Sequence, residues 1–559
     1  MIVDARKANL AANVEFDLII VGSGAAGITL ALSLRQSGLK IAMIEAGGER
    51  FSAEAQQLLA SDAISPKTHS PTHMYRQRLL GGSTAIWGGR CIPFDPIDFE
   101  DRPWMEAAHW PITHGDVAKH WPQALRIAEA GLPEFNAAQA WPGDQEPMVK
   151  GVDSADVILD RIERFSKPSH FGKIWRENME QAANLTVYTH APVTQILLHD
   201  NNRVRGVRCS MDGRAVEMTA PRVVLAAGGI ETARLLLASR ESQSVGVGNG
   251  RDLVGRYYQC HLEGEVGHLH FLSPSSDLRL NYGKSHDDIY CRRYIWLSPE
   301  AQRREHLGGM VLRPGHPSIV DPRHRHPVLS AMYLVKNFIV PEYARKMTAL
   351  EHKIRANHSS GLSYYGAHIA NILRGAPKLA VFGTDWLRRR TLAKRKLPSV
   401  VLPDPRNFYP ADINAEQEPN YLSRISIGDT RDALGMPRVQ VDWRTTDADY
   451  ERLVRSIHTI SAAFATSRTV RYDVEGIDVA TLRDLIVPIG GHHIGTARMA
   501  DSAAEGVCDS NCEVFDAPGL FIAGAASFPT SSFANPTLTI VALSLRLAEY
   551  LAPGRTLSI

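Results

Sequence analysis

A glycine-rich turn between two apolar segments near the start of the chain constrains the fold more than any other feature. Residues 17–21, DLIIV, are typical of a strand that is buried on both faces of a parallel sheet. GSGAAG follows at 22–27, and the apolar spacing of 28–38 predicts a helix. Residues 39–45, LKIAMIE, form a second apolar strand. This βαβ unit of roughly thirty residues predicts a doubly wound α/β domain.

The glycines of this turn have the spacing of a dinucleotide-binding fingerprint. Gly22 permits a tight turn, Gly24 lets a pyrophosphate approach the backbone, and Gly27 allows the helix to pack closely on the strand. The free N–H groups at the start of the helix attract phosphate. We therefore predict cofactor contacts from Gly22, Ser23, Gly24, Ala25, Ala26 and Gly27.

An acidic residue ends the second strand of the unit. Glu45 lies eighteen residues after Gly27, where a carboxylate accepts hydrogen bonds from a ribose diol. Its negative charge argues against a 2′-phosphate, and we include the adjacent Ala46 among the predicted contacts. The turn and Glu45 do not by themselves distinguish NAD from FAD.

Two later segments repeat the pattern of a buried strand that ends in small residues. VVLAA at 223–227 leads into GG and an apparent helix, and LFIA at 520–523 leads into GAAS and a later helix. Such strands line up along one edge of a doubly wound sheet. The nucleotide-binding fold is therefore expected to combine the start of the chain, a middle section near 185–240 and the C-terminal seventy residues.

A second glycine cluster, LGGSTAIWGGR at 80–90, favours FAD. A glycine-rich loop can wrap its backbone around a large flat ring and a diphosphate. Ile86 and Trp87 argue against an ordinary surface loop, and segments near 22, 85 and 525 together suit the length of FAD. The further predicted cofactor contacts are Gly82, Ser83, Trp87, Gly88, Gly89, Arg90, Val193, Ala227, Gly228, Gly524, Ala525, Asn535, Pro536 and Thr537.

A histidine and an asparagine near the C-terminus are the candidate catalytic residues. His492 lies in GGHHIGTARM, after the strand-like run 485–489, and histidine is the usual general base near neutral pH. Asn535 follows 43 residues later, and Pro536 holds its backbone extended. An amide in that position can donate to an oxygen that gains charge. From these residues alone, two satisfied core histidines are an equally good interpretation of His492 and His493.

Composition excludes several classes of protein. The chain has 62 basic and 60 acidic residues and a net charge of +2, so it lacks the global field of a nucleic-acid-binding protein. Six cysteines in 559 residues do not form a disulfide framework. Cys508 and Cys512 have no good zinc ligands nearby, and no metal centre is predicted.

No segment predicts secretion or a membrane span. The N-terminus lacks an apolar region with a cleavage site, and the uncharged stretch 517–545 contains three prolines. A cytoplasmic protein is expected. The segment 345–400 is expected to be helical, and its basic residues 388–390 and 394–396 are interpreted as a solvated helix face. Docking to an acidic partner or a membrane surface is the alternative, although membrane association is not expected.

Six ordered motifs resemble the glucose–methanol–choline (GMC) oxidoreductases, which are FAD enzymes that oxidise alcohols. The resemblance runs from about Phe16 to Leu551. Besides the first glycine motif with Glu45 and the loop at 80–90, the matching segments are AAGGIETARLLL (226–237), EPNYLSRISIGD (418–429), HHIGTARM (492–499) and AGAASFPTSSFANPT (523–537).

The resemblance implies an α/β fold with a Rossmann-like FAD-binding domain assembled from discontinuous segments. An α+β substrate-binding domain built on an antiparallel sheet completes it. We assign 1–100, 185–260 and 488–559 to the FAD-binding domain, and 101–184 and 261–487 to the substrate-binding domain.

The resemblance also implies the catalytic pair. His492 fits the family pattern H-x-x-G-T, whereas His493 does not, and Asn535 falls at the second family position. A His–Asn pair is more similar to the pyranose oxidase and fructose dehydrogenase-like branch than to the glucose oxidase branch. Pyranose oxidases commonly tether FAD through a histidine where this chain has Ile86, so FAD is expected to be non-covalent.

These features suggest a reaction. A sugar or glycoside loses a hydride from a secondary carbinol carbon to flavin N5 and becomes a ketone, while His492 takes the hydroxyl proton and Asn535 binds the same oxygen. His493 is a tentative substrate contact. Oxygen or an external acceptor reoxidises the flavin, and an oligomer is possible. Polar substrates are mildly favoured by residues that the sequence does not place: Tyr257, Tyr258, His261, His268, Tyr364 and Tyr365.

Three other functions remain open. The chain could be a membrane-attached component of an electron-transfer chain that uses 345–400 as an interfacial helix. The substrate could be a non-sugar alcohol, such as a sterol, an aliphatic alcohol or an aryl alcohol. The chain could also be a non-catalytic binding protein that keeps the flavin fold, because fold does not imply function.

Overall fold

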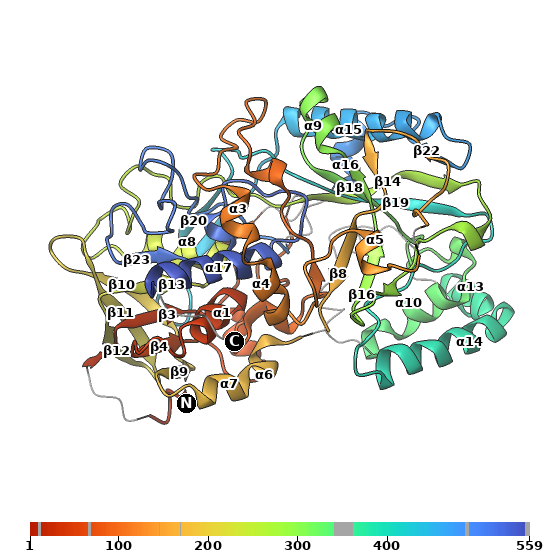
Figure 1. The fold of residues 1–559 in the computed structure, drawn as a ribbon. Coiled ribbons are helices and arrows are strands. Elements are labelled where there is room, and N and C mark those ends of the chain that lie inside the picture. The colour runs from red at the N-terminus through yellow and green to blue at the C-terminus, as the bar shows by residue number, and fades with distance from the viewer. Residues whose placement is uncertain are drawn as a thin grey trace.

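The computed structural model describes residues 1–8, 13–64, 69–144, 146–167, 169–339, 362–486 and 491–553. Figure 1 shows two groups of sheets, with the N-terminus in the group on the left. The left group is built on a parallel sheet, and the right group is built on antiparallel strands. This mixed α/β architecture confirms the predicted fold class.

The central sheet of the left group has six strands, all parallel. In spatial order they are β1 (Ile2–Asp4), β9 (Leu185–Thr189), β4 (Ile41–Ile44), β3 (Leu18–Val21), β13 (Val223–Leu225) and β23 (Leu520–Ile522). Strands from the start, the middle and the end of the chain therefore lie side by side, as the repeated pattern predicted. The edge strand β1 carried no signal that the sequence analysis recognised.

Register brings the ends of four strands to the same level. Val21 pairs with Ile44 and with Leu225, and Leu225 pairs with Ile522. Parallel strands have their carboxyl ends at one edge, so the residues that follow these four meet there. Helices α1 (Ala25–Ser33), α8 (Gly229–Ala238) and α17 (Thr537–Leu551) begin close to that edge. All four strands are completely buried.

The right group contains a second six-stranded sheet, in which every pairing is antiparallel. Its strands are β22 (Val470–Asp473), β14 (Leu262–Phe271), β19 (Phe408–Ala415), β18 (Met310–Pro314), β17 (Ile295–Leu297) and β7 (Val157–Ile158). The long strand β14 contains the histidine-rich run that the sequence suggested as a strand.

Three smaller sheets complete the strands. They are β15 (Gly283–Lys284), β16 (Tyr290–Arg293), β8 (Ile162–Phe165) and β6 (Arg90–Cys91); β10 (Val193–Leu198), β11 (Val204–Met211), β12 (Arg214–Thr219) and β2 (Asn13–Glu15); and β20 (Arg424–Arg431), β21 (Pro437–Asp442) and β5 (Ala63–Ile64). The exact residue boundaries between the two domains stay a prediction.

The other helices surround these sheets. They are α2 (Ala53–Gln57), α3 (His114–Ala118), α4 (Trp121–Ile127), α5 (Ala137–Ala140), α6 (Phe171–Ile174), α7 (Arg176–Gln181), α9 (Pro299–Glu305), α10 (Pro327–Ile339), α13 (Leu362–Arg374), α14 (Ala376–Trp386), α15 (Asp447–Ala465) and α16 (Val479–Leu485). Short helical turns are η1 (Gly82–Ala85), η2 (Pro96–Phe99), η3 (Ser275–Asp277), η4 (Pro322–His324), η5 (Leu387–Leu392) and η6 (Ala525–Ser527).

The structure confirms part of the predicted helix at 345–400 and contradicts the start of the predicted strand at 485–489. The helical expectation for 345–400 is confirmed from Leu362 to Leu392 by α13, α14 and η5, and its first part, up to 361, lies outside the described residues. Residues 393–400 are not helical, because the helical backbone ends at Leu392, so the interpretation of 394–396 as a solvated helix face is wrong. The strand-like run 485–489 is not a strand at its start, because Leu485 is the last residue of α16. Residues 487–490 lie outside the described part of the chain. Among the described residues, no helix is long and apolar enough to cross a membrane.

A buried ion pair links two segments of the right group that are far apart in sequence, near residues 102 and 416. Arg102 donates two hydrogen bonds to Glu416, at 2.6 and 2.7 Å, and both side chains are fully buried. Asp98 lies in the same cluster, and burial together with the Glu416 charge raises its pKa to about 8. The Asp98 carboxyl accepts a hydrogen bond from Ser532, which lies in the loop before α17. The cluster therefore joins the right group to the loop that carries Asn535.

We predict that Arg102→Met lowers the free energy of unfolding by about 3–5 kcal/mol, because it leaves the Glu416 carboxylate buried without its partner. The matched control is Arg303→Met, which breaks an exposed pair with Glu100 and is expected to cost at most about 1 kcal/mol. Urea titration of both variants measures the difference. Equal losses would contradict the assignment.

Candidate active site

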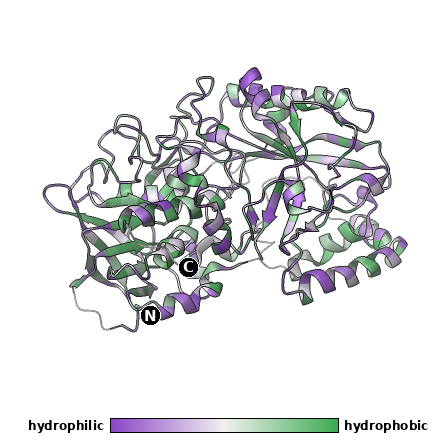
Figure 2. Cartoon of the chain, viewed as in Figure 1, coloured by the Kyte–Doolittle hydropathy of each residue, from purple (hydrophilic) through white to green (hydrophobic). Residues whose placement is uncertain are grey.

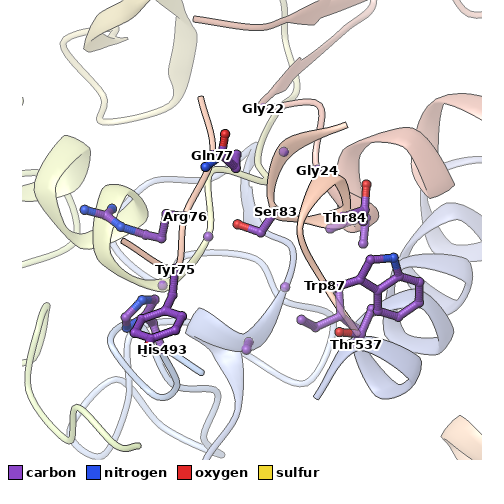
Figure 3. A pocket seen from close by; sticks show the side chains of 18 of the residues that line it. Gly22, Gly24, Tyr75, Arg76, Gln77, Ser83, Thr84, Trp87, His493 and Thr537 are labelled. Atoms are coloured by element: carbon purple, nitrogen blue, oxygen red, sulfur yellow. The ribbon is translucent and has the colours of Figure 1, made fainter. Parts of the chain in front are cut away.

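A cavity of about 630 Å³ lies where the four strands of the parallel sheet end. The predicted residues that line it are Gly22, Ser23, Gly24, Ala25, Ala26, Glu45, Ala46, Gly82, Ser83, Trp87, Gly88, Arg90, Val193, Ala227, Gly228, Gly524, Ala525, Asn535, Pro536 and Thr537, together with His492 and His493. Gly27 and Gly89 are outside this lining. Figure 3 shows Gly22 and Gly24 on one wall, with Trp87 and His493 on opposite sides of the view.

The three glycines of the first turn have different structural roles, which the space around each one shows. Gly22 has a φ of +103°, and a Cβ atom there would lie 2.5 Å from the Ala226 carbonyl oxygen. A Cβ on Gly27 would lie 1.9 Å from the Gly22 carbonyl oxygen. A Cβ on Gly24 would meet nothing within 4 Å, and Gly24 lines the cavity. Gly22 and Gly27 therefore serve packing, whereas Gly24 leaves room for a bound group.

Three helix N-termini at this cavity lack a side-chain cap. They begin after Gly24 in α1, after Gly228 in α8 and after Pro536 in α17, and all three of these residues line the cavity. The first N–H groups of a helix have no partner inside the helix and attract anions. The arrangement fits a ligand with a diphosphate and further hydrogen-bond acceptors.

The Glu45 carboxylate already accepts several hydrogen bonds from other residues of the protein. Its carboxylate accepts hydrogen bonds from the Ser23 hydroxyl at 2.6 Å, the Ser23 N–H at 3.2 Å and the Gly47 N–H at 2.7 Å. Burial raises the pKa of this carboxyl above its ordinary value. A carboxylate offers about four acceptor positions, so few remain for a ribose. Glu45 thus also orders the glycine turn, a role that the sequence did not reveal.

The candidate catalytic residues do meet at the far end of the cavity. His492 Nε2 lies 3.1 Å from Asn535 Nδ2, and His492 Nδ1 lies 3.1 Å from His261 Nδ1. His261 Nε2 lies 3.2 Å from the Ser531 carbonyl oxygen. Asn535 Oδ1 has no hydrogen-bond partner among the described residues.

The Ser531 carbonyl oxygen determines which ring nitrogens of His261 and His492 carry hydrogen. A carbonyl only accepts, so His261 Nε2 carries a hydrogen, and the Nδ1 of a neutral His261 is bare. His492 must then donate from its own Nδ1, which leaves a lone pair on His492 Nε2. The Asn535 amide donates to that lone pair. His492 is therefore held as the tautomer that can accept a proton at Nε2.

Glu263 lies beneath this pair. Its carboxylate is 3.8 Å from the Nδ1 atoms of both His261 and His492. Burial opposes ionisation of Glu263, but its interactions with His261, His492 and Arg90 outweigh burial and lower its pKa. Burial, reinforced by His261, lowers the pKa of His492 to about 3. The His492 side chain keeps 22% of its surface exposed, so the buried base still opens into the cavity.

His493 belongs to a different cluster. Its Nδ1 lies 2.7 Å from the Tyr258 hydroxyl, which is 2.6 Å from His69 Nε2. His69 Nδ1 is 2.6 Å from the Ser70 carbonyl and must donate to it, so Tyr258 donates to His69 and accepts from His493. His493 Nε2 then carries a lone pair, and it has no partner among the described residues. His493 lines the cavity but makes no hydrogen bond to His492.

The remaining wall combines aromatic and polar side chains. Phe165, Tyr282 and Ser399 line it, together with Glu263 and Arg90. Sequence analysis missed His261, Glu263 and Ser399 as site residues, although Glu263 lies in β14 and His261 immediately precedes that strand. Of the unplaced tyrosines and histidines, His261 and Tyr258 support the site from behind. Tyr257, His268, Tyr364 and Tyr365 do not line the cavity.

Besides Glu134 with His286 and Asp287, two groups of side chains have the composition of metal ligands. They are His261 with Glu263 and His492, and His69 with Cys260 and His493. In the second group the Tyr258 hydroxyl is within hydrogen-bond distance of both histidines. The absence of a metal stays a prediction, which elemental analysis of the purified protein tests.

Two family models match the chain. A model described as FAD dependent oxidoreductase matches residues 17–333, and one described as GMC oxidoreductase matches residues 419–544. The first spans more than half of the chain. The chain belongs to the FAD-dependent oxidoreductases of the GMC type. The open space at Gly24, the three uncapped helices and the unpartnered His493 Nε2 fit FAD in the cavity.

Known relatives are distant. The 2-methyl-1,2-propanediol dehydrogenase of Mycolicibacterium austroafricanum is 23% identical over 601 aligned residues, which cover 96% of this chain and 95% of that protein. The C-glycoside 3-oxidase of Microbacterium trichothecenolyticum is 37% identical over 134 residues, or 23% of this chain and 24% of its own length. The structure of pyridoxine 4-oxidase from Mesorbium loti has a TM-score of 0.51 at 17% identity, with 96% and 98% of the two chains covered. That likeness supports the fold.

Replacing Gly24 and Gly27 by alanine separates cofactor binding from folding. Gly24→Ala is expected to keep the stability of the FAD-free protein but to weaken FAD binding, because the new methyl group enters the cavity. Gly27→Ala is expected to destabilise the protein itself by about 1–3 kcal/mol or more, because its methyl group collides with backbone. Flavin titration and urea unfolding of the FAD-free variants measure both effects. The same loss of stability in both variants would contradict the division of roles.

Proposed function

We propose that the protein oxidises a secondary hydroxyl group of a sugar or glycoside to a ketone, with His492 as the base and Asn535 as the hydrogen-bond partner. The observation that carries the proposal is that His492 and Asn535 both line the cavity, with His492 Nε2 3.1 Å from Asn535 Nδ2. FAD supplies the hydride acceptor, the N5 atom of its isoalloxazine ring.

The chain's own residues hold the cofactor without a covalent bond in this proposal. The Gly22–Gly27 turn, Glu45 and the uncapped helix starts hold the dinucleotide portion. The glycine loop that ends at Arg90 and the start of α17 hold the ring portion. Ile86 lines the same cavity and offers no nucleophile for a tether.

His492 and its neighbours handle the proton. In this step the substrate oxygen replaces His492 Nε2 as the acceptor of the Asn535 N–H, which frees the Nε2 lone pair. The substrate hydroxyl then donates to His492 Nε2 as its carbinol carbon loses a hydride, so the O–H and C–H bonds break and a carbonyl forms. The negative charge of Glu263, 3.8 Å from His492 Nδ1, stabilises the imidazolium that forms. Asn535 donates to the substrate oxygen and holds it in line. Positioned proton transfer of this kind contributes roughly 10²- to 10⁴-fold.

The lining of the cavity supports a carbohydrate. Phe165, Trp87 and Tyr282 offer ring faces, and Arg90, Glu263 and Ser399 offer hydrogen bonds. Sites for polar ligands combine such surfaces with a few placed polar groups. The local similarity to a C-glycoside 3-oxidase adds support. A second candidate is an aliphatic diol, which the full-length similarity to 2-methyl-1,2-propanediol dehydrogenase favours.

Anaerobic mixing of the holoenzyme with a panel of substrates tests the proposal. Free sugars, O- and C-glycosides, short aliphatic diols and aryl alcohols are compared by the rate at which each bleaches the flavin. We expect a sugar or glycoside to be the fastest. A faster diol would replace the first candidate with the second. Hydrogen peroxide formation in air, compared with dye reduction, then identifies oxygen or an external acceptor as the reoxidant.

His492 is expected to act as a base over an unusually wide pH range. Because its pKa is lowered to about 3, the imidazole stays unprotonated, and active as a base, until the pH falls toward that value. The rate constant for flavin reduction should therefore show no acidic limb from His492 between pH 8 and 5. His492→Ala should reduce it by roughly 10²-fold or more while FAD stays bound. A limb near the ordinary histidine pKa of about 6.5 would contradict the assignment.

Glu263→Gln is expected to slow flavin reduction by roughly tenfold to a hundredfold, because it removes the negative charge beside the imidazolium that forms. The matched control is Glu265→Gln, two residues further along β14 and outside the cavity lining, which should leave the rate unchanged. Both variants are compared at pH 8, because burial raises the pKa of Glu265 to about 7. Stopped-flow reduction by one substrate measures both variants. Equal rates in the two variants would exclude an electrostatic role for Glu263.

A further inference from the structure

Helix α13 exposes its apolar side. Leu362, Tyr365, Ile369 and Leu373 are all exposed, and the spacing of three, four and four residues places them on one face. Leu362 is 94% exposed and Leu373 is 71% exposed. A surface helix ordinarily turns such a stripe toward the core.

The inward face of α13 is polar instead. His368 and Asn371 are buried there, and each lies within 3.1 Å of the Ser330 hydroxyl on α10. Asn371 also donates to the Pro322 carbonyl at 2.8 Å. These hydrogen bonds fix the rotation of the helix, so the apolar stripe cannot turn inward without leaving buried polar groups unsatisfied.

The exposed apolar surface continues onto the neighbouring helices. Val381 on α14 and Leu387 and Leu392 on η5 are exposed, as are Met332 and Val335 on α10. Nine of the seventeen exposed large apolar residues of the described chain belong to these helices. Figure 1 places α10, α13 and α14 together at the lower right, and Figure 2 shows apolar and polar residues alternating along them. Gathered apolar surface of this kind marks an interaction site.

The same segment is strongly basic. Residues 362–396 contain eight basic residues and one acidic residue, in a chain whose net charge is only +2. Three of the basic residues have partners within the chain: Arg389 forms an ion pair with Asp385, and Arg390 and Arg395 donate to backbone carbonyl groups. Five further cations are exposed and form no ion pair with the described residues: Arg374, Lys378, Arg388, Lys394 and Lys396.

We propose that the surface formed by residues 362–396 docks onto a lipid bilayer that contains anionic phospholipid. Exposed apolar side chains can enter the boundary between headgroups and acyl chains, and flanking cations are attracted to anionic headgroups. A second copy of this chain would bring two equally basic surfaces together, and an acidic protein would not by itself explain the apolar stripe of α13. Pro398 and Ser399 follow this segment directly and line the cavity, so docking holds the active site beside the lipid surface.

Vesicle flotation of the holoenzyme tests the proposal. Vesicles of phosphatidylcholine alone are compared with vesicles of equal parts phosphatidylcholine and phosphatidylglycerol, at low and at high salt. We expect flotation with the anionic vesicles at low salt, weakening as salt screens the charges. Flotation that is absent with both vesicles, or equal with both, would overturn the proposal.

Two sets of substitutions separate charge from apolar contact. The combined variant Arg388→Glu, Lys394→Glu and Lys396→Glu, and the combined variant Leu362→Ser, Ile369→Ser and Leu373→Ser, should each weaken vesicle binding at least about tenfold. The matched control reverses three exposed cations in or beside β1, β11 and β12, outside residues 362–396: Lys7→Glu, Arg203→Glu and Arg214→Glu. It carries the same change in net charge and should bind as the unchanged protein does.

Three further results decide between occupants. Flavin content and turnover with a water-soluble substrate should be unchanged in all three variants, which shows that they fold. If the control variant lost vesicle binding to the same extent, net charge alone would explain the weakened binding, and the proposal would be overturned. Binding to immobilised polyglutamate without binding to vesicles would instead indicate an acidic protein. Self-association that the serine variant abolishes, again without vesicle binding, would indicate a second copy.

Discussion

The Ser531 carbonyl oxygen determines the chemistry that this site can perform. It accepts from His261, which forces His492 to donate from Nδ1 and to keep its lone pair on Nε2. The Asn535 amide faces the same Nε2 atom. Without the carbonyl, either nitrogen of each ring could carry the proton, and the base could point away from the cavity. A backbone group that only accepts thus orients a proton acceptor two side chains away.

Burial keeps the His492 imidazole neutral, and the fold holds its partners in place. The pKa of His492 falls because its surroundings are desolvated, so the ring is neutral at physiological pH, and the Glu263 carboxylate is close enough to stabilise the cation that proton transfer creates. The partners come from segments far apart in sequence: Glu263 lies in β14 and His261 immediately before it, and the loop before α17 carries Ser531 and Asn535. The ion pair between Arg102 and Glu416, with Asp98 and Ser532, ties that loop to the antiparallel group.

Local patterns in the sequence predicted the parallel sheet, the glycine turn and the positions of His492 and Asn535, because each depends on neighbouring residues. The support of the site could not be predicted in the same way. His261 and His492 are separated by 231 residues, and nothing in either segment identifies the other as its partner. The dual role of Glu45 needs the hydrogen bonds from Ser23 and Gly47 to be seen. The exposed stripe of α13 was also hidden, since an amphipathic pattern does not say which face turns inward.

The tautomer and charge of His492 are the most direct test of this account. Labelling histidine with ¹⁵N, and assigning His492 by its loss in His492→Gln, gives both ring-nitrogen chemical shifts as a function of pH. We predict a neutral ring with hydrogen on Nδ1 and a bare Nε2 down to about pH 5, consistent with a pKa of about 3. A ring protonated at neutral pH, or a neutral ring with hydrogen on Nε2, would contradict the account.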